Sequence, residues 1–221
     1  MSSPKKSLFG FAPLLIVVAV ALAPSIAQAA PHWYRNGVKI GATKERLDSY
    51  FQNFTLNNKT EKFTVVCEVR DEGKMWNPTG GGNGQDEIAF FEAVNCQATG
   101  QGPSCTVTVK AVVSGTSPWA TELEEEFGII RDKIVGFKIE VTLDKKCNIL
   151  PGTTDTYTGE LKPRMVNGTT GGEEGCGKGD SFGEFDEKSG LLKSTKGATA
   201  NIEGNDCIWG ESATPITVAN P

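Results

Sequence analysis

The sequence predicts an all-β protein, an antiparallel β-sandwich with Gly-rich loops and three disulfides. Three observations support this fold class. Apolar and polar residues alternate with a period of two over several segments, glycine-rich turns separate these segments, and the six cysteines form an even count. We therefore expect about eight to ten strands packed as one sandwich.

The alternation is clearest around Phe63, Val65 and Cys67, which share one face while the residues between them are polar. This pattern is typical of a strand with one buried side. Six segments show the pattern and are predicted to be strands: residues 62–70, 105–113, 137–143, 182–185, 191–195 and 198–202.

Two further segments fit more than one kind of element. Residues 86–96 fit a short helix that begins at Asp86, or a strand. As a strand, they would place four residues on one face: Ile88, Phe90, Val94 and Cys96. Residues 119–127 have helical propensity, but we expect a strand or turn there, because strands are predicted on both sides. Gly136 is expected to mark a β-bulge.

The first 29 residues have the features of a signal peptide. Lys5 and Lys6 form a basic start, and an apolar run follows over residues 14–23. Ala27-Gln28-Ala29 ends the segment and places small residues at the third and the first position before the cleavage site, as signal peptidase requires. We expect cleavage after Ala29, with residues 30–221 forming a single secreted β domain. The apolar run is too short for a spanning helix, so no membrane span is expected in the mature chain.

The charge of the chain argues against nucleic acid as a partner. The formal net charge is −5, and removal of the signal peptide with its two lysines would make it about −7. Proteins that bind nucleic acid or anionic membranes need clustered lysine and arginine residues. The basic residues here are scattered among acidic ones, which favours a soluble acidic surface.

The cysteines are predicted to form three disulfides, which fits export. A zinc site is disfavoured because the sequence contains no C-x-x-C pair and only one histidine. Cys96 and Cys105 flank a polar turn, and Cys67 and Cys147 both lie at the apolar parity of predicted strands. The sequence therefore favours the pairs Cys96–Cys105 and Cys67–Cys147, which leaves Cys176–Cys207.

Aromatic residues are the main functional signal. Trp33, Trp76 and Trp119 lie near predicted loops or at the mature N-terminus, and a sandwich that exposes tryptophan can stack sugar rings. The opposing interpretation is that these tryptophans belong to the core. We expect a non-catalytic extracellular or cell-envelope protein that binds a glycan or another protein, with no cofactor.

The alternative function is a secreted, glycosidase-like hydrolase that works with two carboxylates. The sequence singles out no pair of acidic residues for this role, and no catalytic residue is predicted. A Ser-His-Asp triad would have to use His32, which lies close to the predicted mature N-terminus, where chains often fray. The glycine-rich run at residues 80–84 lacks the lysine that follows a phosphate-binding loop, so we expect a flexible hairpin loop.

A calcium site near the C-terminal strands is a weaker hypothesis. Four acidic residues follow a Gly-rich loop there: Asp180, Glu184, Asp186 and Glu187. Their spacing matches no EF-hand pattern, so solvated hairpin carboxylates are favoured and no metal site is predicted. Three Asn-x-Thr sites, at Asn53, Asn58 and Asn167, would matter only in a source that glycosylates them.

Three short motifs resemble a group of secreted proteins of soil actinobacteria that has no assigned activity. They are His32-Trp33-Tyr34-Arg35-Asn36-Gly37-Val38 after the signal peptide, Pro118-Trp119-Ala120-Thr121-Glu122-Leu123, and Arg131-Asp132-Lys133-Ile134. The resemblance implies export from a bacterium and favours an extended conformation for residues 119–127. It implies no chemistry and no site residues.

Overall fold

The computed structural model describes residues 29–100, 105–168, 176 and 180–220. The predicted signal peptide, apart from Ala29, lies outside these residues, as does most of the Gly-rich loop at 168–179. No helix in the described part of the chain has the length and apolar character needed to cross a membrane.

The described residues form a 14-stranded antiparallel sheet and one short 3₁₀-helix. The predicted all-β antiparallel fold class is confirmed. The elements are β1 (His32–Arg35), β2 (Val38–Lys39), β3 (Glu45–Asn58), β4 (Phe63–Trp76), β5 (Gln85–Thr99), β6 (Val107–Ala111), β7 (Trp119–Glu126), β8 (Ile129–Leu143), β9 (Thr154–Leu161), β10 (Arg164–Asn167), β11 (Ser181–Phe185), β12 (Leu192–Ser194), β13 (Thr199–Gly210), η1 (Glu211–Ala213) and β14 (Thr214–Ala219).

The two layers of the sandwich belong to one sheet that closes on itself. Strand pairing runs from β3 through β4, β5, β7, β8, β10, β11 and β13 and back to β3. A second circuit shares the long strands β3, β4, β5, β8 and β13 but closes through β6, β9 and β12. Five long strands therefore run the length of the molecule, and each end has its own set of short strands.

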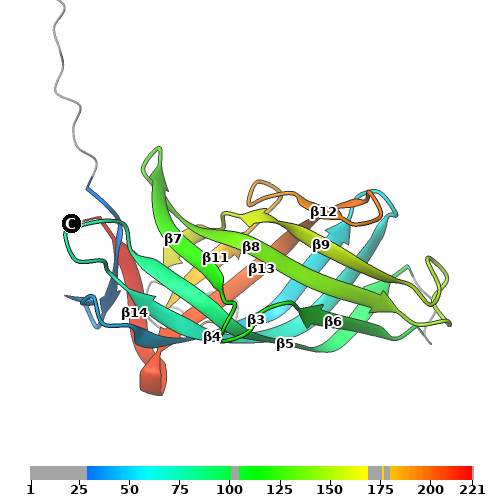
Figure 1. Ribbon diagram of the computed structural model, residues 1–221, viewed down its shortest axis with the longest axis horizontal. Helices are drawn as coiled ribbons and strands as arrows, with labels where there is room; N and C mark the ends of the chain where they lie inside the picture. The colour runs from blue at the N-terminus through cyan, green and yellow to red at the C-terminus, as the bar shows by residue number, and fades with distance from the viewer. Residues whose placement is uncertain (1–28, 101–104, 169–175, 177–179, 221) are drawn as a thin grey trace, which may run out of the picture.

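The N-terminal and C-terminal strands cover one end of the closed sheet. β14 pairs with both β13 and β1, and β1 pairs with β2. Figure 1 shows β14 in red and the blue N-terminal strands together at one end of the long axis, with β6 towards the other end. The chain beyond Gly210 therefore returns across the end that β7, β10 and β11 enclose.

The interior contains two large hydrophobic clusters, one towards each end. The larger one surrounds Phe54, Ile139 and Tyr157, where β6, β9 and β12 complete the sheet. The second contains Trp33 and Ile216 from the covering strands together with residues of the long strands. Both clusters are built from alternate residues, because successive side chains of a strand point to opposite faces of the sheet.

The predicted strand segments agree with the structure, and residues 86–96 and 119–127 are both extended, in β5 and β7. The predicted face of β5 was right for Ile88 and Cys96, which contact the core, and wrong for Phe90 and Val94. The register between β4 and β5 shifts near Gly73, which turns Phe90 and Val94 outwards, each 44% exposed, and turns Phe91 towards the core. Gly136 has a φ of 75° and lies where the register between β8 and β9 shifts, so the predicted bulge is confirmed.

The three disulfides are Cys67–Cys96, Cys105–Cys147 and Cys176–Cys207. The last was predicted, whereas the predicted pairs Cys96–Cys105 and Cys67–Cys147 were wrong. β4 and β5 form a hairpin that brings Cys67 opposite Cys96, with 4.1 Å between their Cα atoms. β6 and β8 are also neighbours, so Cys105 before β6 meets Cys147 after β8. Both disulfides join residues in or near neighbouring strands. The alternation of apolar and polar residues shows which face of a strand a cysteine occupies, but it does not show which strands are neighbours.

Candidate functional site

Two of the three tryptophans predicted to bind a ligand lie in the core. Trp33 is fully buried in the second hydrophobic cluster, and Trp119 is 3% exposed between Phe91 and Phe137. The expectation of an exposed platform built from all three residues is therefore corrected. Trp119 takes an inward position on β7 of the closed sheet, and Trp33 points from the covering strand β1 into the cluster that it shares with Ile216.

Trp76 is the exception, because it lies at the end of β4 with its side chain on the outer face, half-buried. It lines a surface groove of about 190 Å³ with Gln85, Glu122 and Val135. Val135 is 47% exposed and supplies an apolar wall. Lys44 Nζ lies 4.2 Å from the centroid of the indole ring, which places a cation over one face of Trp76.

The polar groups of this groove are held by neighbouring residues. Asn83 donates a hydrogen bond of 3.1 Å from Nδ2 to Glu122 Oε1. Lys44 pairs with Glu87 at 2.6 Å, so the charge above the indole is balanced. An aromatic wall beside positioned amide and carboxylate groups is the combination that carbohydrate sites use.

The glycine-rich loop before β5 has a structural role. Asn77 is buried and exchanges hydrogen bonds with Trp33: its Oδ1 accepts from the Trp33 N–H, and its Nδ2 donates to the Trp33 carbonyl. The Gly84 N–H donates to the Pro31 carbonyl at 2.7 Å. The loop therefore fastens the N-terminal strand to the closed sheet.

The predicted mature N-terminus is not frayed where His32 lies. His32 starts β1, pairs in register with Ala219 and is 2% exposed. Burial lowers the pKa of its imidazole, and the charge of Lys39 lowers it further. A backbone hydrogen bond with Ala30 opposes this and raises the pKa, and no side chain of the described residues is hydrogen-bonded to the ring, so no triad forms around this histidine there.

Sequence reasoning missed an interior layer of four aspartates, which we call the aspartate layer. Asp71, Asp86, Asp132 and Asp206 come from β4, β5, β8 and β13, and each is at most 8% exposed. Together they line a cavity of about 20 Å³ inside the closed sheet.

The aspartate layer separates the two hydrophobic clusters. The remaining lining of the cavity includes Ile88, Ile134 and Phe185 from the larger cluster. It also includes Leu47, Met165 and Ile208 from the second cluster. The four carboxyl groups are therefore flanked on both sides by apolar side chains.

Two buried hydroxyl groups accompany the carboxyl groups. Ser49 is the register partner of Asp71 across β3 and β4, and Thr121 is the register partner of Asp86 across β5 and β7. Ser49 is 1% exposed and Thr121 is 4% exposed. The Ser49 hydroxyl lowers the pKa of Asp71 and Asp206, and the Thr121 hydroxyl lowers the pKa of Asp86 and Asp132, so each hydroxyl interacts with two carboxyl groups. Among the described residues, neither hydroxyl makes a hydrogen bond of good geometry, and one oxygen of each carboxyl group of the layer also lacks one.

Burial dominates the electrostatics of the aspartate layer. It raises the pKa of Asp71 to about 6 and the pKa of Asp132 to about 7. It also raises the pKa of Asp86 and Asp206 well above the ordinary range, and the charges of neighbouring aspartates add to this rise. A carboxyl group that loses water without gaining a cation favours its neutral form.

The aspartate layer does not form a glycosidase site. Two carboxylates of a glycosidase stand roughly 5 to 10 Å apart with a sugar between them. A cavity of about 20 Å³ has room for about one water molecule and none for a sugar ring. The hydrolase alternative thus gains no support from these buried acids.

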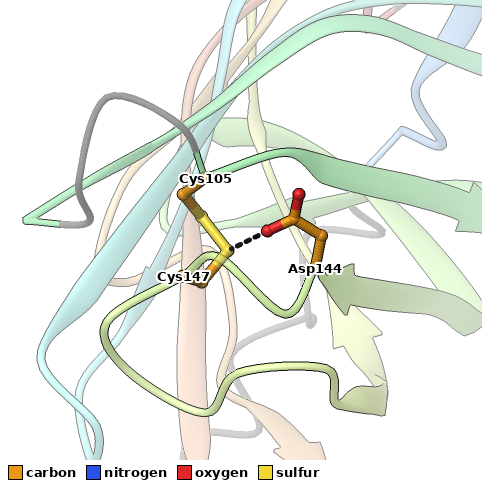
Figure 2. A group of neighbouring side chains, drawn as sticks. All are labelled: Cys105, Asp144 and Cys147. Atoms are coloured by element: carbon orange, nitrogen blue, oxygen red, sulfur yellow. Dashed lines mark hydrogen bonds between the residues drawn. A yellow bond between two sulfur atoms is a disulfide. The ribbon is translucent and has the colours of Figure 1, made fainter.

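A third group of side chains has the spacing of a metal site but is occupied by a disulfide. Cys105, Asp144 and Cys147 lie together between β6 and the loop after β8, and within the described chain they form the one such close group (Figure 2). Cys147 Sγ lies 3.4 Å from Asp144 Oδ1. Because both sulfurs are joined in the disulfide, neither is available as a thiolate ligand.

The acidic residues considered for calcium are engaged elsewhere. Glu184 faces Arg164 at 3.5 Å, and Glu187 pairs with Lys59 at 2.6 Å. Asp186 Oδ1 accepts hydrogen bonds from the Lys188 N–H and the Ser189 hydroxyl. These contacts fit the predicted hairpin carboxylates.

Comparison with known proteins gives no guide to the site. No protein-family model matches this sequence, no curated protein matches it, and no solved structure matches its fold. The function has to be argued from the groove and the interior layer themselves.

Proposed function

We propose that this chain is an exported, non-catalytic protein that binds a neutral glycan outside the cell or in the cell envelope, in the groove beside Trp76. The observation that carries the proposal is the position of Trp76. Of the three tryptophans considered from the sequence, it is the one that lines an open groove, and polar side chains stand around it.

The size of the groove defines the kind of ligand. Sites for whole small molecules usually occupy roughly 300 to 1,000 Å³. A groove of about 190 Å³ suits one ring of a longer chain, with the rest of the ligand lying on the surface. The acidic surface of the protein favours an uncharged polysaccharide over an anionic one.

Export is part of the same proposal. Three disulfides are consistent with an oxidising compartment, and the basic and apolar start of the chain fits cleavage after Ala29. Intact-mass measurement of the protein purified from the culture medium of its source tests this: a chain that begins at Ala30 is expected.

Binding is tested by co-sedimentation of the oxidised mature protein with a panel of insoluble polysaccharides, while released sugar is assayed in the same tubes. We expect retention on one neutral polysaccharide without sugar release. Trp76→Ala should weaken retention at least about tenfold, because the stacking surface is lost. The matched control is Phe127→Ala, which removes a fully exposed aromatic from the β7–β8 turn.

Three results would overturn the proposal. Release of soluble sugar would restore the hydrolase alternative. Retention that Trp76→Ala leaves intact would place the site elsewhere. Retention on protein-containing envelope fractions alone, lost after protease treatment, would identify a protein partner.

A further inference from the structure

The aspartate layer places up to four negative charges in the interior without a balancing cation. The groups that face the layer from β3 and β4 add negative charge, because Asp48 and Glu72 both raise the pKa of Asp71. β5 and β8 contribute the other acids, and β7 contributes only the hydroxyl of Thr121. The described lining of the cavity contains no lysine, arginine or histidine.

The remaining walls are apolar or lack a side chain. β10 contributes Met165, β11 contributes Gly183 and Phe185, and β13 contributes Ile208 beside Asp206. An ionised carboxylate held between such walls loses its hydration and gains no partner, which is costly. The charge of each buried carboxylate therefore has to be neutralised, either by a bound proton or by a bound cation.

The geometry favours protons over a metal ion. A calcium ion needs six to eight oxygen ligands at about 2.3 to 2.6 Å, so its ligands crowd together. Among the described residues, no three aspartates of the layer bring one carboxylate oxygen each within 4.8 Å of one another. The cavity of about 20 Å³ is instead large enough for one water molecule, which makes two to four hydrogen bonds.

Two buried hydroxyl groups point to the same occupant. The Ser49 hydroxyl interacts with Asp71 and Asp206, and the Thr121 hydroxyl interacts with Asp86 and Asp132, but neither makes a hydrogen bond of good geometry with a described residue. A hydroxyl can donate to one oxygen and accept from another, and a protonated carboxyl group can donate as well. Protons shared among these groups and one water would satisfy the layer.

We propose that the aspartate layer is a proton-binding site, in which carboxyl groups kept neutral by bound protons join the two hydrophobic clusters, so that the folded state responds to external pH. The proposal does not require glycan binding by Trp76, although Asp86 contributes to the lining of both the interior cavity and the Trp76 groove. Its occupant is the proton, and its effect is to stabilise the closed sheet while the protons are bound.

The pKa shifts of the layer set the direction of the pH effect. All four pKa values are raised in the folded state, to about 6 for Asp71 and about 7 for Asp132, whereas an unfolded aspartate titrates near 3.9. The stabilisation is therefore complete below about pH 4 and is lost as the pH rises through the folded values. The protein should become less stable from about pH 4.5 to about pH 7.5.

The test is urea unfolding of the full mature protein across this range, in the presence of a chelator. We expect the unfolding equilibrium constant to rise at least about tenfold per pH unit, the change expected for each proton that unfolding releases. Asp132→Asn should lower the number of protons released on unfolding by about one, and it should stabilise the protein at neutral pH. Glu92→Gln, which changes an exposed acid on the outer face of β5, should keep the wild-type slope.

Other results would overturn the proposal. A stability that is flat or that rises over this range would show that the carboxyl groups are ionised when folded. Stabilisation by added calcium at neutral pH, present in the wild type and lost in Asp132→Asn, would identify a cation site instead. Carbon NMR of aspartate-labelled wild-type protein needs no variant: four carboxyl signals should remain in their protonated positions near pH 5, and ionised positions would refute the assignment.

Discussion

The position of a tryptophan on its strand decides whether it serves packing or binding. Trp33 and Trp119 occupy inward positions, and each touches the hydrophobic cluster around it. Trp76 follows the buried Met75, and the alternation of β4 turns it to the outer face. A shift of one position along a strand therefore decides whether a tryptophan packs in the core or lies on the surface, where it can contact a ligand.

Substitution of these tryptophans should separate the two roles. Trp33→Ala and Trp119→Ala are each expected to reduce the free energy of unfolding by about 3 to 5 kcal/mol, because each leaves a cavity in a packed cluster. Trp76→Ala should cost about 1 kcal/mol or less, since the side chain is half-exposed. Urea unfolding followed by circular dichroism measures all three, and a similar loss for Trp76→Ala would contradict its outer position.

A register shift between β4 and β5 sets the faces of both strands. Gly73 lies at this shift, and a Cβ atom there would collide with the carbonyl oxygen of Glu87 on β5. The close approach of the two backbones requires glycine at this point. The shift also turns Phe90 outwards, where it lines a surface pocket with Gly73 and Glu87.

Gly73→Ala should therefore destabilise the protein by roughly 1 to 3 kcal/mol, because two backbones would have to separate. The control is Gly41→Ala, where a Cβ atom meets nothing within 4 Å and the backbone is not left-handed. That change is expected to stay within about 0.5 kcal/mol of the wild type. Equal effects of the two substitutions in urea unfolding would show that the close approach at Gly73 does not matter.

Alternation in the sequence located most of the strands, because each has one buried face. It failed where the register shifts, as at Phe90. A bulge exchanges the inward and outward positions of the residues that follow it, and the residue types there do not reveal the bulge. Six strands were not predicted: β1, β2, β3, β9, β10 and β14. Polar residues of β3 such as Ser49 and Asn58 occupy buried positions, which interrupts the apolar pattern.

The aspartate layer did leave a signal in the sequence. Asp86, Asp132 and Asp206 each precede a buried isoleucine by two residues, and so occupy the inward parity of their strands. An inward aspartate that recurs in the same three-residue pattern is evidence for a polar interior site. What alternation does not provide is the closure of the sheet, which brings these distant strands to one cavity.

Closure of the sheet depends on short strands at both ends of the molecule. β10 and β11 have 4 and 5 residues and complete the circuit around the aspartate layer. The Cys176–Cys207 disulfide joins the segment before β11 to β13. The Cys105–Cys147 disulfide holds β6 and β8 together at the other end. Each bridge thus joins the segment before a short strand to a long strand or to the loop that follows one.

Removal of one bridge should therefore loosen one end of the molecule. Replacement of both Cys176 and Cys207 by alanine is expected to cost about 3 to 4 kcal/mol, from the chain entropy of the 31-residue separation. Hydrogen exchange should accelerate first in β10 and β11, because they lose their covalent tie to β13. The matched variant, with Cys105 and Cys147 replaced, should accelerate exchange in β6 and leave β10 and β11 protected. Uniform acceleration in both variants would mean that the two ends unfold as one unit, and the aspartate layer between them would then couple the clusters more tightly than their separate packing suggests.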